Sequence, residues 1–457
     1  MLTPSKFLRT LGLCFTAAAL VLGANVLKAE PKPENPPELD EKISNAVQPL
    51  QALLDAKKYD EAMHTIDGLI AKTPAVSYDR AFLSLIKTQI YGQKGELSSA
   101  LVPLEQMLKI ADELKLFRFS RALPISEQDT LVNLASLYLQ EASAPGKTPE
   151  EIHGYYAKAR TYGKRLVSGP KKPTVDAQSI WARILYSEAT MDPNKVDMTL
   201  MKQAAEAAQK ALTLVVKPKE EHYTLLLAAL QQLGENARCA ELLELMVKLF
   251  PNNKNYYSML FGFYVSMQGS DNKDADLSAI VTLERAQAIG QMTANKDNFA
   301  LAAMYLNIQQ FGYAAELFEK GLRSGKIDSD QRNWELLASA YQQQGMDNRA
   351  IDTFLEAIKR FPKSPTLEQQ VGQLYYNQDK REEAYVHLCA AVKKGLDKPA
   401  QTLVTAAYLG MQLGKLEDAL ALAEQAVKAD PKSKNAQQIL DAIKETITER
   451  EKFKNQK

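Results

Sequence analysis

The chain has 457 residues, of which 46% are hydrophobic and 24% are charged, and its formal net charge is +1 at pH 7. This composition is that of an ordinary folded protein and excludes an intrinsically disordered chain. The near balance of acidic and basic residues gives no indication of a nucleic acid or an anionic membrane surface as a partner.

The N-terminus has the layout of a secretory signal peptide. Lys6 and Arg9 form a short positive start, an apolar run covers residues 11–27, and Ala29 is a small residue suited to cleavage before Glu30. We therefore predict a signal peptide over residues 1–29 and an exported protein. The alternative is an uncleaved anchor, because the apolar run is at the short edge of what a membrane span requires.

A spacer follows the predicted signal peptide. Residues 30–38, EPKPENPPE, are so rich in proline that they favour neither helix nor sheet, and we predict a Pro-rich linker there. After cleavage the chain would keep only Cys239 and Cys389, which lie far apart and do not make a disulfide framework. The exported protein must therefore be held together by packing.

The clearest structural unit lies at residues 334–362, WELLASAYQQQGMDNRAIDTFLEAIKRFP. Gly345 suits the left-handed conformation at a helix end, and Pro362 prevents a second helix from continuing. The residues that share one face of each predicted helix are Trp334, Leu337, Ala338 and Tyr341 in the first and Ala350, Phe354 and Ala357 in the second. This order of apolar and small residues along two helices resembles the tetratricopeptide repeat (TPR), with Ala338 in place of the usual Gly.

The unit recurs at a nearly constant period. The small residues that mark the second helix are about 35 residues apart, close to the TPR period, and they are Ala279, Ala314, Ala350, Ala384 and Ala419. Insertions near Pro145, Met191 and Gly269 make some units irregular. One helix pair cannot bury its apolar face alone, but stacked neighbours can. The sequence therefore predicts an all-α fold, a right-handed α-solenoid of about ten TPR-type helix pairs with a C-terminal capping helix.

The predicted domain organisation follows from these units. We expect an N-terminal TPR array with irregular repeats and insertions over residues 39–251 and a C-terminal TPR array over residues 252–432. Residues 433–457 are rich in Lys, Glu and Gln, and we predict that they form a capping helix and tail, since a solenoid needs a polar surface at its open end.

No motif in the sequence indicates catalysis. His64, His153, His222 and His387 are scattered without metal-ligand spacing, and we expect each on a helix surface or in a groove. Cys239 occupies a marker position and should be a small buried side chain. There is no phosphate-binding loop and no nucleophile elbow. We predict no catalytic residue, no metal and no cofactor, and thus not an enzyme, although catalytic residues need not be neighbours in sequence.

The resemblance to TPR domains implies a binding surface. In that family the first helix of each pair lines a concave groove, and the residues that map to it here as partner-binding are Phe299, Gln342, Gln369, Gln373, Tyr376, Asn377, Tyr408 and Gln412. The alternative is that these amides only solvate exposed helices. The Lys and Asn that clamp a terminal carboxylate in some members are replaced by Glu335 and Ser339, or by Gln369 and Gln373, so an acidic peptide tail is not the expected ligand.

Several stretches resemble the exported TPR proteins that accompany ExbB–ExbD–TonB energy-transduction systems of Gram-negative bacteria. They are residues 46–74, 249–290, 298–327 and 333–351, whereas residues 131–217 fit less clearly. The resemblance implies a periplasmic accessory that couples inner-membrane proton flow to outer-membrane import of iron or another scarce nutrient. Its partners would be proteins or peptides, among them ExbB, ExbD, TonB or a TonB-dependent receptor, with membrane contact only through partners or an uncleaved signal.

Two alternatives remain open. The first is an adaptor in another envelope assembly, such as secretion, polysaccharide or outer-membrane biogenesis machinery. The second, from a different class, is an exported hydrolase whose active site is built from the repeats.

Overall fold

The computed structural model describes residues 36–119, 122–170, 172–269 and 273–455. The predicted signal peptide and most of the predicted linker lie outside these residues. Every regular element in the described ranges is a helix. None of the helices described there is long and apolar enough to cross a membrane.

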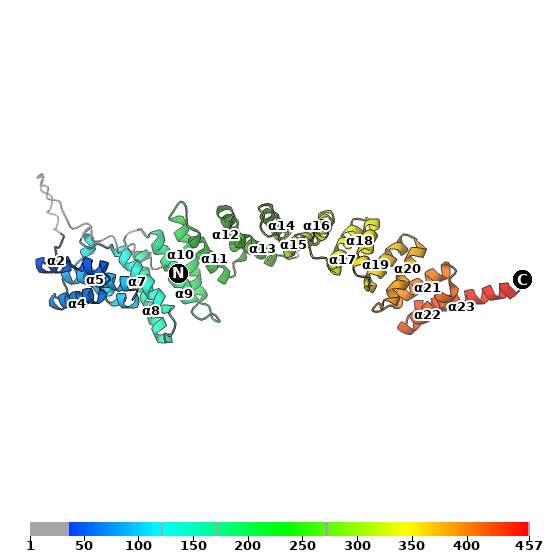
Figure 1. The fold of residues 1–457 in the computed structure, drawn as a ribbon, viewed down its shortest axis with the longest axis horizontal. Coiled ribbons are helices and arrows are strands. Elements are labelled where there is room, and N and C mark those ends of the chain that lie inside the picture. Colours follow the sequence, from blue (N-terminus) through cyan, green and yellow to red (C-terminus); the bar gives the residue numbers. More distant parts are fainter. Residues whose placement is uncertain (1–35, 120–121, 171, 270–272, 456–457) are drawn as a thin grey trace. The chain divides into compact units, whose positions relative to one another are not determined.

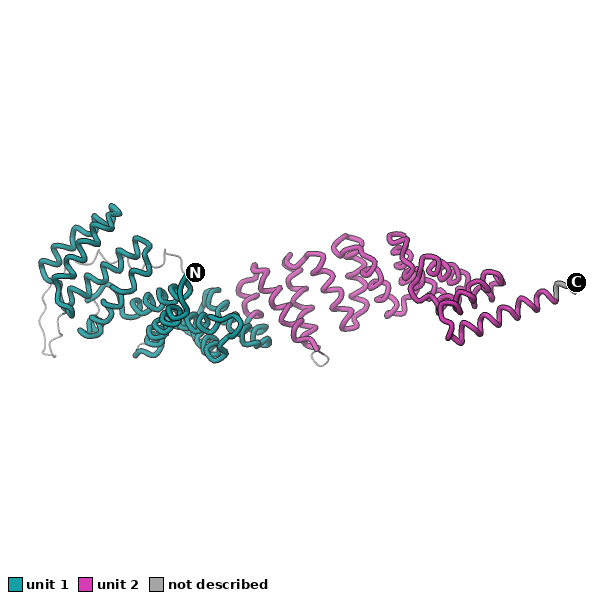
Figure 2. The backbone as a smooth tube through the Cα atoms, turned by 90° about the horizontal axis from the view of Figure 1, so that it is seen from below, with its two compact units in different colours: residues 1–242 teal, residues 243–457 magenta. Residues whose placement is uncertain are grey.

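The chain divides into two compact units, with the division between Leu242 and Leu243 (Figure 2). The division falls within helix α12 (Asn236–Leu249). The boundary predicted from the sequence, at residue 251, lies in the turn that follows the same helix.

The first unit consists of helices that follow one another in pairs (Figure 1). They are α2 (Glu41–Val47) and α3 (Leu50–Asp55) with α4 (Tyr59–Lys72), α5 (Tyr78–Lys94) with α6 (Leu101–Glu113), α7 (Glu127–Ala142) with α8 (Pro149–Ser168), α9 (Val175–Ala189) with α10 (Met198–Thr213), and α11 (Glu220–Gln232), which leads into α12. Short 3-10 turns, η1 (Ser98–Ala100) and η2 (Leu116–Arg118), flank α6.

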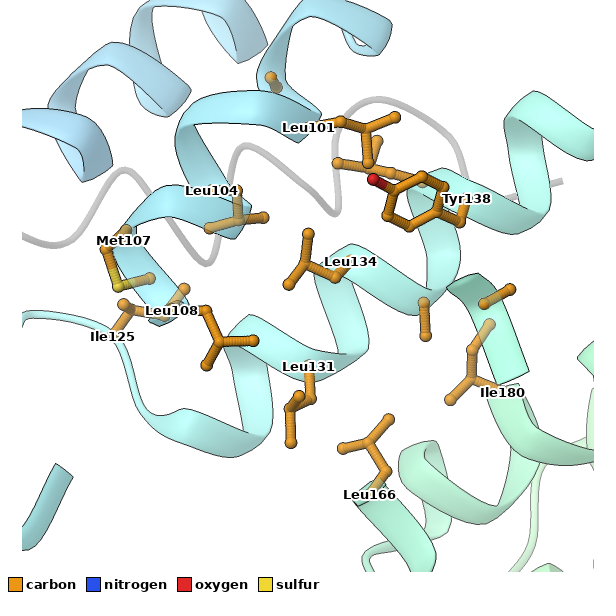
Figure 3. Packing of buried hydrophobic residues seen from close by; sticks show 14 of the residues in the cluster. Leu101, Leu104, Met107, Leu108, Ile125, Leu131, Leu134, Tyr138, Leu166 and Ile180 are labelled. Carbon is orange, nitrogen blue, oxygen red and sulfur yellow. The ribbon is translucent and has the colours of Figure 1, made fainter. Parts of the chain in front are cut away.

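The core of the first unit lies between the helices of successive pairs. Figure 3 shows Leu104 of α6 beside Leu134 of α7 and Met107 of α6 near Ile125, with Leu166 of α8 and Ile180 of α9 in the same cluster. Leu104, Met107 and Leu134 are completely buried. Burial of one such side chain is worth about 1.5–3 kcal/mol, so this stacking stabilises helices that would not persist alone.

The second unit contains the more regular repeats. Its pairs are α13 (Lys254–Ser266) with α14 (Lys273–Ala288), α15 (Asn295–Asn307) with α16 (Phe311–Ser324), α17 (Gln331–Gln343) with α18 (Asp347–Arg360), α19 (Pro365–Asn377) with α20 (Arg381–Lys393), and α21 (Ala400–Gln412) with α22 (Leu416–Ala429). The last helix, α23 (Lys434–Asn455), packs on α21 and α22. These observations confirm the predicted all-α fold of TPR-type helix pairs closed by a C-terminal helix.

The helix ends lie where the sequence signals place them. In the unit at residues 334–362, α17 ends at Gln343 and Gly345 follows with φ +71°. The second helix, α18, ends at Arg360, just before Pro362. The left-handed residue lets the chain reverse at once, so the two helices of a pair can pack against each other.

Small residues bring the two helices of a pair into close contact. The five marker alanines, Ala279, Ala314, Ala350, Ala384 and Ala419, are completely buried. At Gly372 of α19, a Cβ atom would lie 2.7 Å from Cγ of Leu388 in α20. Close packing tolerates no added volume at such a point. The repeated small residue is therefore a packing requirement.

Candidate functional site

The candidate site is one face of the first helices in the second unit. These five helices, α13, α15, α17, α19 and α21, each have 13 residues. Positions five, nine, twelve and thirteen share one face at helical spacing, and we call them the first-helix face. It comprises Ser258, Gly262, Val265, Ser266, Phe299, Ala303, Leu306, Asn307, Glu335, Ser339, Gln342, Gln343, Gln369, Gln373, Tyr376, Asn377, Val404, Tyr408, Met411 and Gln412; each is exposed or half-buried.

The first-helix face carries almost no charge. Glu335 is its single ionisable acid or base apart from the tyrosines, and it accepts a hydrogen bond from Gln331 (Nε2–Oε1 2.7 Å). The second helices, in contrast, are charged on their outer surfaces. On α18, for example, Glu356 pairs with Arg360 (3.1 Å) and with Arg323 of α16 (3.3 Å). The first-helix face thus carries a single charged residue, although the first helices bear exposed charges at other positions, such as Lys296 and Arg332.

Hydrogen bonds between side chains hold neighbouring first helices side by side. Gln331 of α17 donates to Thr366 of α19 (Nε2–Oγ1 3.0 Å). Gln369 of α19 donates in the same way to Thr402 of α21 (2.9 Å). Amide–hydroxyl bonds of this kind are each worth about 1 kcal/mol. They restrain α17, α19 and α21 relative to one another.

Two tyrosines are the most prominent rings on this face. Tyr376 of α19 and Tyr408 of α21 are 38% and 37% exposed, and Gln412 donates to the hydroxyl of Tyr408. Arg381 donates to Asp379 (Nε–Oδ1 2.8 Å). That bond, together with the nearby Tyr408 and Tyr376, raises the pKa of Arg381. The cation beside the tyrosines is therefore paired within the chain.

The structure separates the predicted partner-binding residues into two groups. Phe299 is half-buried and packs edge-on against Phe318 with ring centres 5.9 Å apart, so it contributes to the core. Gln369 bridges to Thr402, and Gln342 is half-buried. The exposed members are Gln373, Tyr376, Asn377, Tyr408 and Gln412.

Two exposed amide residues of the same face were not predicted. Asn307 and Gln343 are the last residues of α15 and α17, as Asn377 and Gln412 are of α19 and α21. The sequence signal that could have found them is an amide side chain two residues before the Gln, Gly or Asp at which the chain reverses after each of these four helices.

A shallow hollow lies on the second helices α16 and α18, away from the first-helix face. It is lined by Arg323, Asp352, Leu355, Glu356, Lys359 and Arg360. The ion pairs of Glu356 with Arg323 and Arg360 already neutralise much of its charge. This hollow shares no residue with the first-helix face, and its paired charges do not define a ligand site.

One buried carboxylate links a first helix to a second helix. Glu368 of α19 accepts a hydrogen bond from Lys394 (Nζ–Oε1 2.6 Å), and its Oε2 contacts Nδ1 of His387 (2.6 Å). His387 lies within α20, and Lys394 directly follows that helix. Burial opposes ionisation of Glu368, but these two hydrogen bonds outweigh it and lower its pKa. The group is a structural clamp between α19 and α20.

One histidine departs from its predicted position. His222 is buried, and its Nδ1 accepts a hydrogen bond from the backbone N–H of Lys219 (3.0 Å), at the start of α11. It was predicted on a surface or in a groove, and that prediction was wrong. Cys239 is completely buried, as predicted. Among the described residues, no three His, Cys, Asp or Glu side chains group as metal ligands.

No family model matches the chain. No curated protein matches it either. Solved structures do resemble it. YrrB, described as a TPR protein with an unusual peptide-binding site, is 16% identical with a TM-score of 0.32, and the match covers 44% of this chain and 97% of YrrB.

Two further solved structures are similar to parts of the chain. MamA is 17% identical with a TM-score of 0.28, over 36% of this chain and 91% of MamA. PilF of Pseudomonas aeruginosa is 13% identical with a TM-score of 0.30, over 52% of this chain and 99% of PilF.

Proposed function

We propose that this protein is a binding scaffold of the bacterial cell envelope whose protein partners dock on the first-helix face. The observation that carries the proposal is the low charge of this face: five first helices of equal length share a face with two exposed tyrosines and a single charged residue, Glu335. The cores of protein interfaces are depleted of charged residues and enriched in tyrosine. A merely solvated helix surface would more often carry Lys and Glu.

The scaffold would act by presenting a preformed surface. The side chains under the face are locked in the core, as Trp334 is 1% and Tyr341 is 3% exposed. The bonds from Gln331 to Thr366 and from Gln369 to Thr402 restrain neighbouring helices. A surface that is ordered before binding loses little conformational entropy on association. Binding would thus involve no chemical step and no cofactor.

We further propose that the protein works in the periplasm as an accessory of a TonB-type energy-transduction system for outer-membrane nutrient import. The support is the signal-like N-terminus and the stretches at residues 46–74, 249–290, 298–327 and 333–351 that resemble exported accessory proteins of such systems. In this role the scaffold would hold ExbD, TonB or a TonB-dependent receptor while proton flow through the inner membrane drives import.

The test combines cross-linking in intact envelopes with a matched pair of variants. Tyr376→Ala with Tyr408→Ala should reduce the recovered partner about tenfold or more, because buried interface tyrosines each contribute about 1 kcal/mol or more. Tyr313→Ala is the control, since this tyrosine is 61% exposed on a second helix. Circular dichroism should show that all variants keep their helix content.

The identity of the captured protein separates the proposals. TonB, ExbD or a TonB-dependent receptor would support the accessory role. A secretion or polysaccharide complex would keep the scaffold and replace the system it serves. Equal capture by the Tyr376/Tyr408 double variant and the control would contradict docking on the first-helix face.

A further inference from the structure

We propose that the loop between α10 and α11, residues 214–219, inserts its apolar tip into the surface of a bilayer that contains anionic lipids. The loop would attach the protein to a membrane directly, in addition to any attachment through its partners. It belongs to the first unit, so the inference is independent of docking on the first-helix face. Three observations carry it: an exposed apolar run, a fixed base beneath the run, and lysines on both sides.

The loop exposes three large apolar side chains in a row. Leu214 is 40%, Val215 is 38% and Val216 is 97% exposed. Within the part of the chain that the structure describes, no other three consecutive large apolar side chains are exposed. Single exposed apolar residues are common on folded proteins, whereas a run of them is unfavourable unless it binds something. The run is therefore a candidate contact surface.

The base of the loop is fixed by the two helices that it joins. The backbone N–H of Leu214 donates to the carbonyl of Ala211 in the last turn of α10 (3.2 Å). At the other end, the buried ring of His222 accepts from the backbone N–H of Lys219 (3.0 Å), and the ring of Pro218 restricts its own φ. The tip is thus presented on a preformed loop and loses little conformational entropy on insertion.

Lysines border the apolar run on both sides. Lys210 lies one helical turn before the run and Lys217 directly after it, and both are exposed. The side chain of Lys219 is 70% exposed, with a carboxylate oxygen of Glu221 at 3.9 Å. Glu220 and Glu221 lie in the first turn of α11, where the positive end of the helix dipole offsets their charge. The border of the run is therefore positive.

This combination favours a lipid surface over a protein pocket as the ligand. The tip at Val216 protrudes, so a rigid partner surface would meet little of it, whereas a fluid headgroup region can close around it. Lysine stems can lie along the acyl boundary while their ammonium groups stay among the phosphates. Insertion would be shallow, because the loop's backbone N–H and C=O groups need water as a hydrogen-bond partner.

This direct contact was not predicted from the sequence. The net charge of +1 gave no indication of an anionic membrane as a partner. A bilayer, however, attracts only the charges near its surface, within a Debye length of about 10 Å at 0.1 M salt. The lysines beside the apolar run therefore decide the contact, and the balance of charge over the rest of the chain does not.

The first experiment measures lipid binding by flotation. The chain begins at Glu30, the predicted mature N-terminus, so that the apolar run at residues 11–27 cannot itself bind lipid. Vesicles of phosphatidylethanolamine and phosphatidylglycerol in equal parts are compared with vesicles of phosphatidylcholine. At about 50 mM NaCl we expect about 25-fold stronger partitioning into the anionic vesicles, the effect of two lysines at about fivefold each. At about 500 mM NaCl the difference should shrink below about fivefold.

Two double variants separate the apolar part of the contact from the electrostatic part. Val215→Ser with Val216→Ser should lower partitioning into anionic vesicles about tenfold or more at both salt concentrations, because less apolar surface leaves water. Lys217→Gln with Lys219→Gln should lower it about 25-fold at low salt and little at high salt. Val102→Ser is the matched control, since this valine is 73% exposed on α6 of the same unit. It should change nothing.

A third measurement locates the tip in the bilayer. Val216→Trp places an indole at the tip, whereas the native Trp181 is half-buried and Trp334 is buried. The added fluorescence should shift to the blue on anionic vesicles and should be quenched by lipids that are brominated near the headgroup end of the acyl chain. Val102→Trp is the control and should show neither effect.

The outcomes decide between a lipid and another partner. Quenching at residue 216 but not at residue 102, with weaker partitioning of both double variants, would support the bilayer contact. It would be overturned if the parent chain did not bind anionic vesicles, or if the serine variant bound them equally well. Loss of a cross-linked protein from the serine variant, without any vesicle binding, would also overturn it. None of these results involves Tyr376 or Tyr408, so docking on the first-helix face is tested separately.

Discussion

Replacement of Gly372 by Ala tests the close contact between the two helices of a pair. The added Cβ would lie 2.7 Å from Cγ and Cδ2 of Leu388 and 3.1 Å from its backbone nitrogen. Overpacking of this kind costs about 1–3 kcal/mol, and the better helix propensity of Ala returns about 1 kcal/mol. The net expectation is a loss of up to about 2 kcal/mol in the free energy of unfolding. The upper part of that range is expected, because a backbone nitrogen cannot turn aside as a side chain can.

Gly262 supplies the matched control. It lies inside α13 of the same unit, and a Cβ there would meet no atom within 4 Å. Gly262→Ala should therefore stabilise the protein by about 0.5–1 kcal/mol. Guanidinium unfolding followed by circular dichroism at the helical minimum measures both variants against the parent chain. Fits should allow for more than one transition, since repeat arrays unfold in parts.

The two variants are compared by the difference between their free energies of unfolding. We expect Gly372→Ala to be less stable than Gly262→Ala by about 1.5–3 kcal/mol. If Gly372→Ala stabilises the chain as much as Gly262→Ala does, α19 and α20 do not approach as closely as described. The argument from buried small residues would then be wrong for this pair.

Two further predictions concern the second unit. Phe354→Ala should destabilise it by about 3–5 kcal/mol, because Phe354 is 2% exposed and the change leaves a cavity; Phe354→Leu should cost less than half as much in the same unfolding assay. Glu368 has a lowered pKa, so the stability it contributes is present at neutral pH and should be lost as the pH falls below 4.5. In a pH series of unfolding measurements, Glu368→Gln should be less stable than the parent at neutral pH, and the gap should narrow in acid; a gap that does not change with pH would contradict this assignment.

The sequence alone determined the repeat and the local helix signals. Ala350 and Phe354 recur at helical spacing, and Gly345 and Pro362 mark helix ends, so the two helices at residues 334–362 follow from local stereochemistry. The near-constant spacing of the marker alanines extended that unit along the chain. These features are local and periodic, which is why they can be predicted without knowledge of distant contacts.

The tertiary structure decided which polar and aromatic residues are available for binding. Phe299 has the same register on α15 as the exposed Ser258 has on α13, yet it is half-buried and packs against Phe318. Likewise, Gln369 is engaged by Thr402, whereas Gln373 and Asn377 stay exposed. His222 is buried as a helix cap although it was predicted on a helix surface or in a groove. Exposure depends on what the neighbouring repeat places opposite a side chain, and the repeat period by itself does not contain that information.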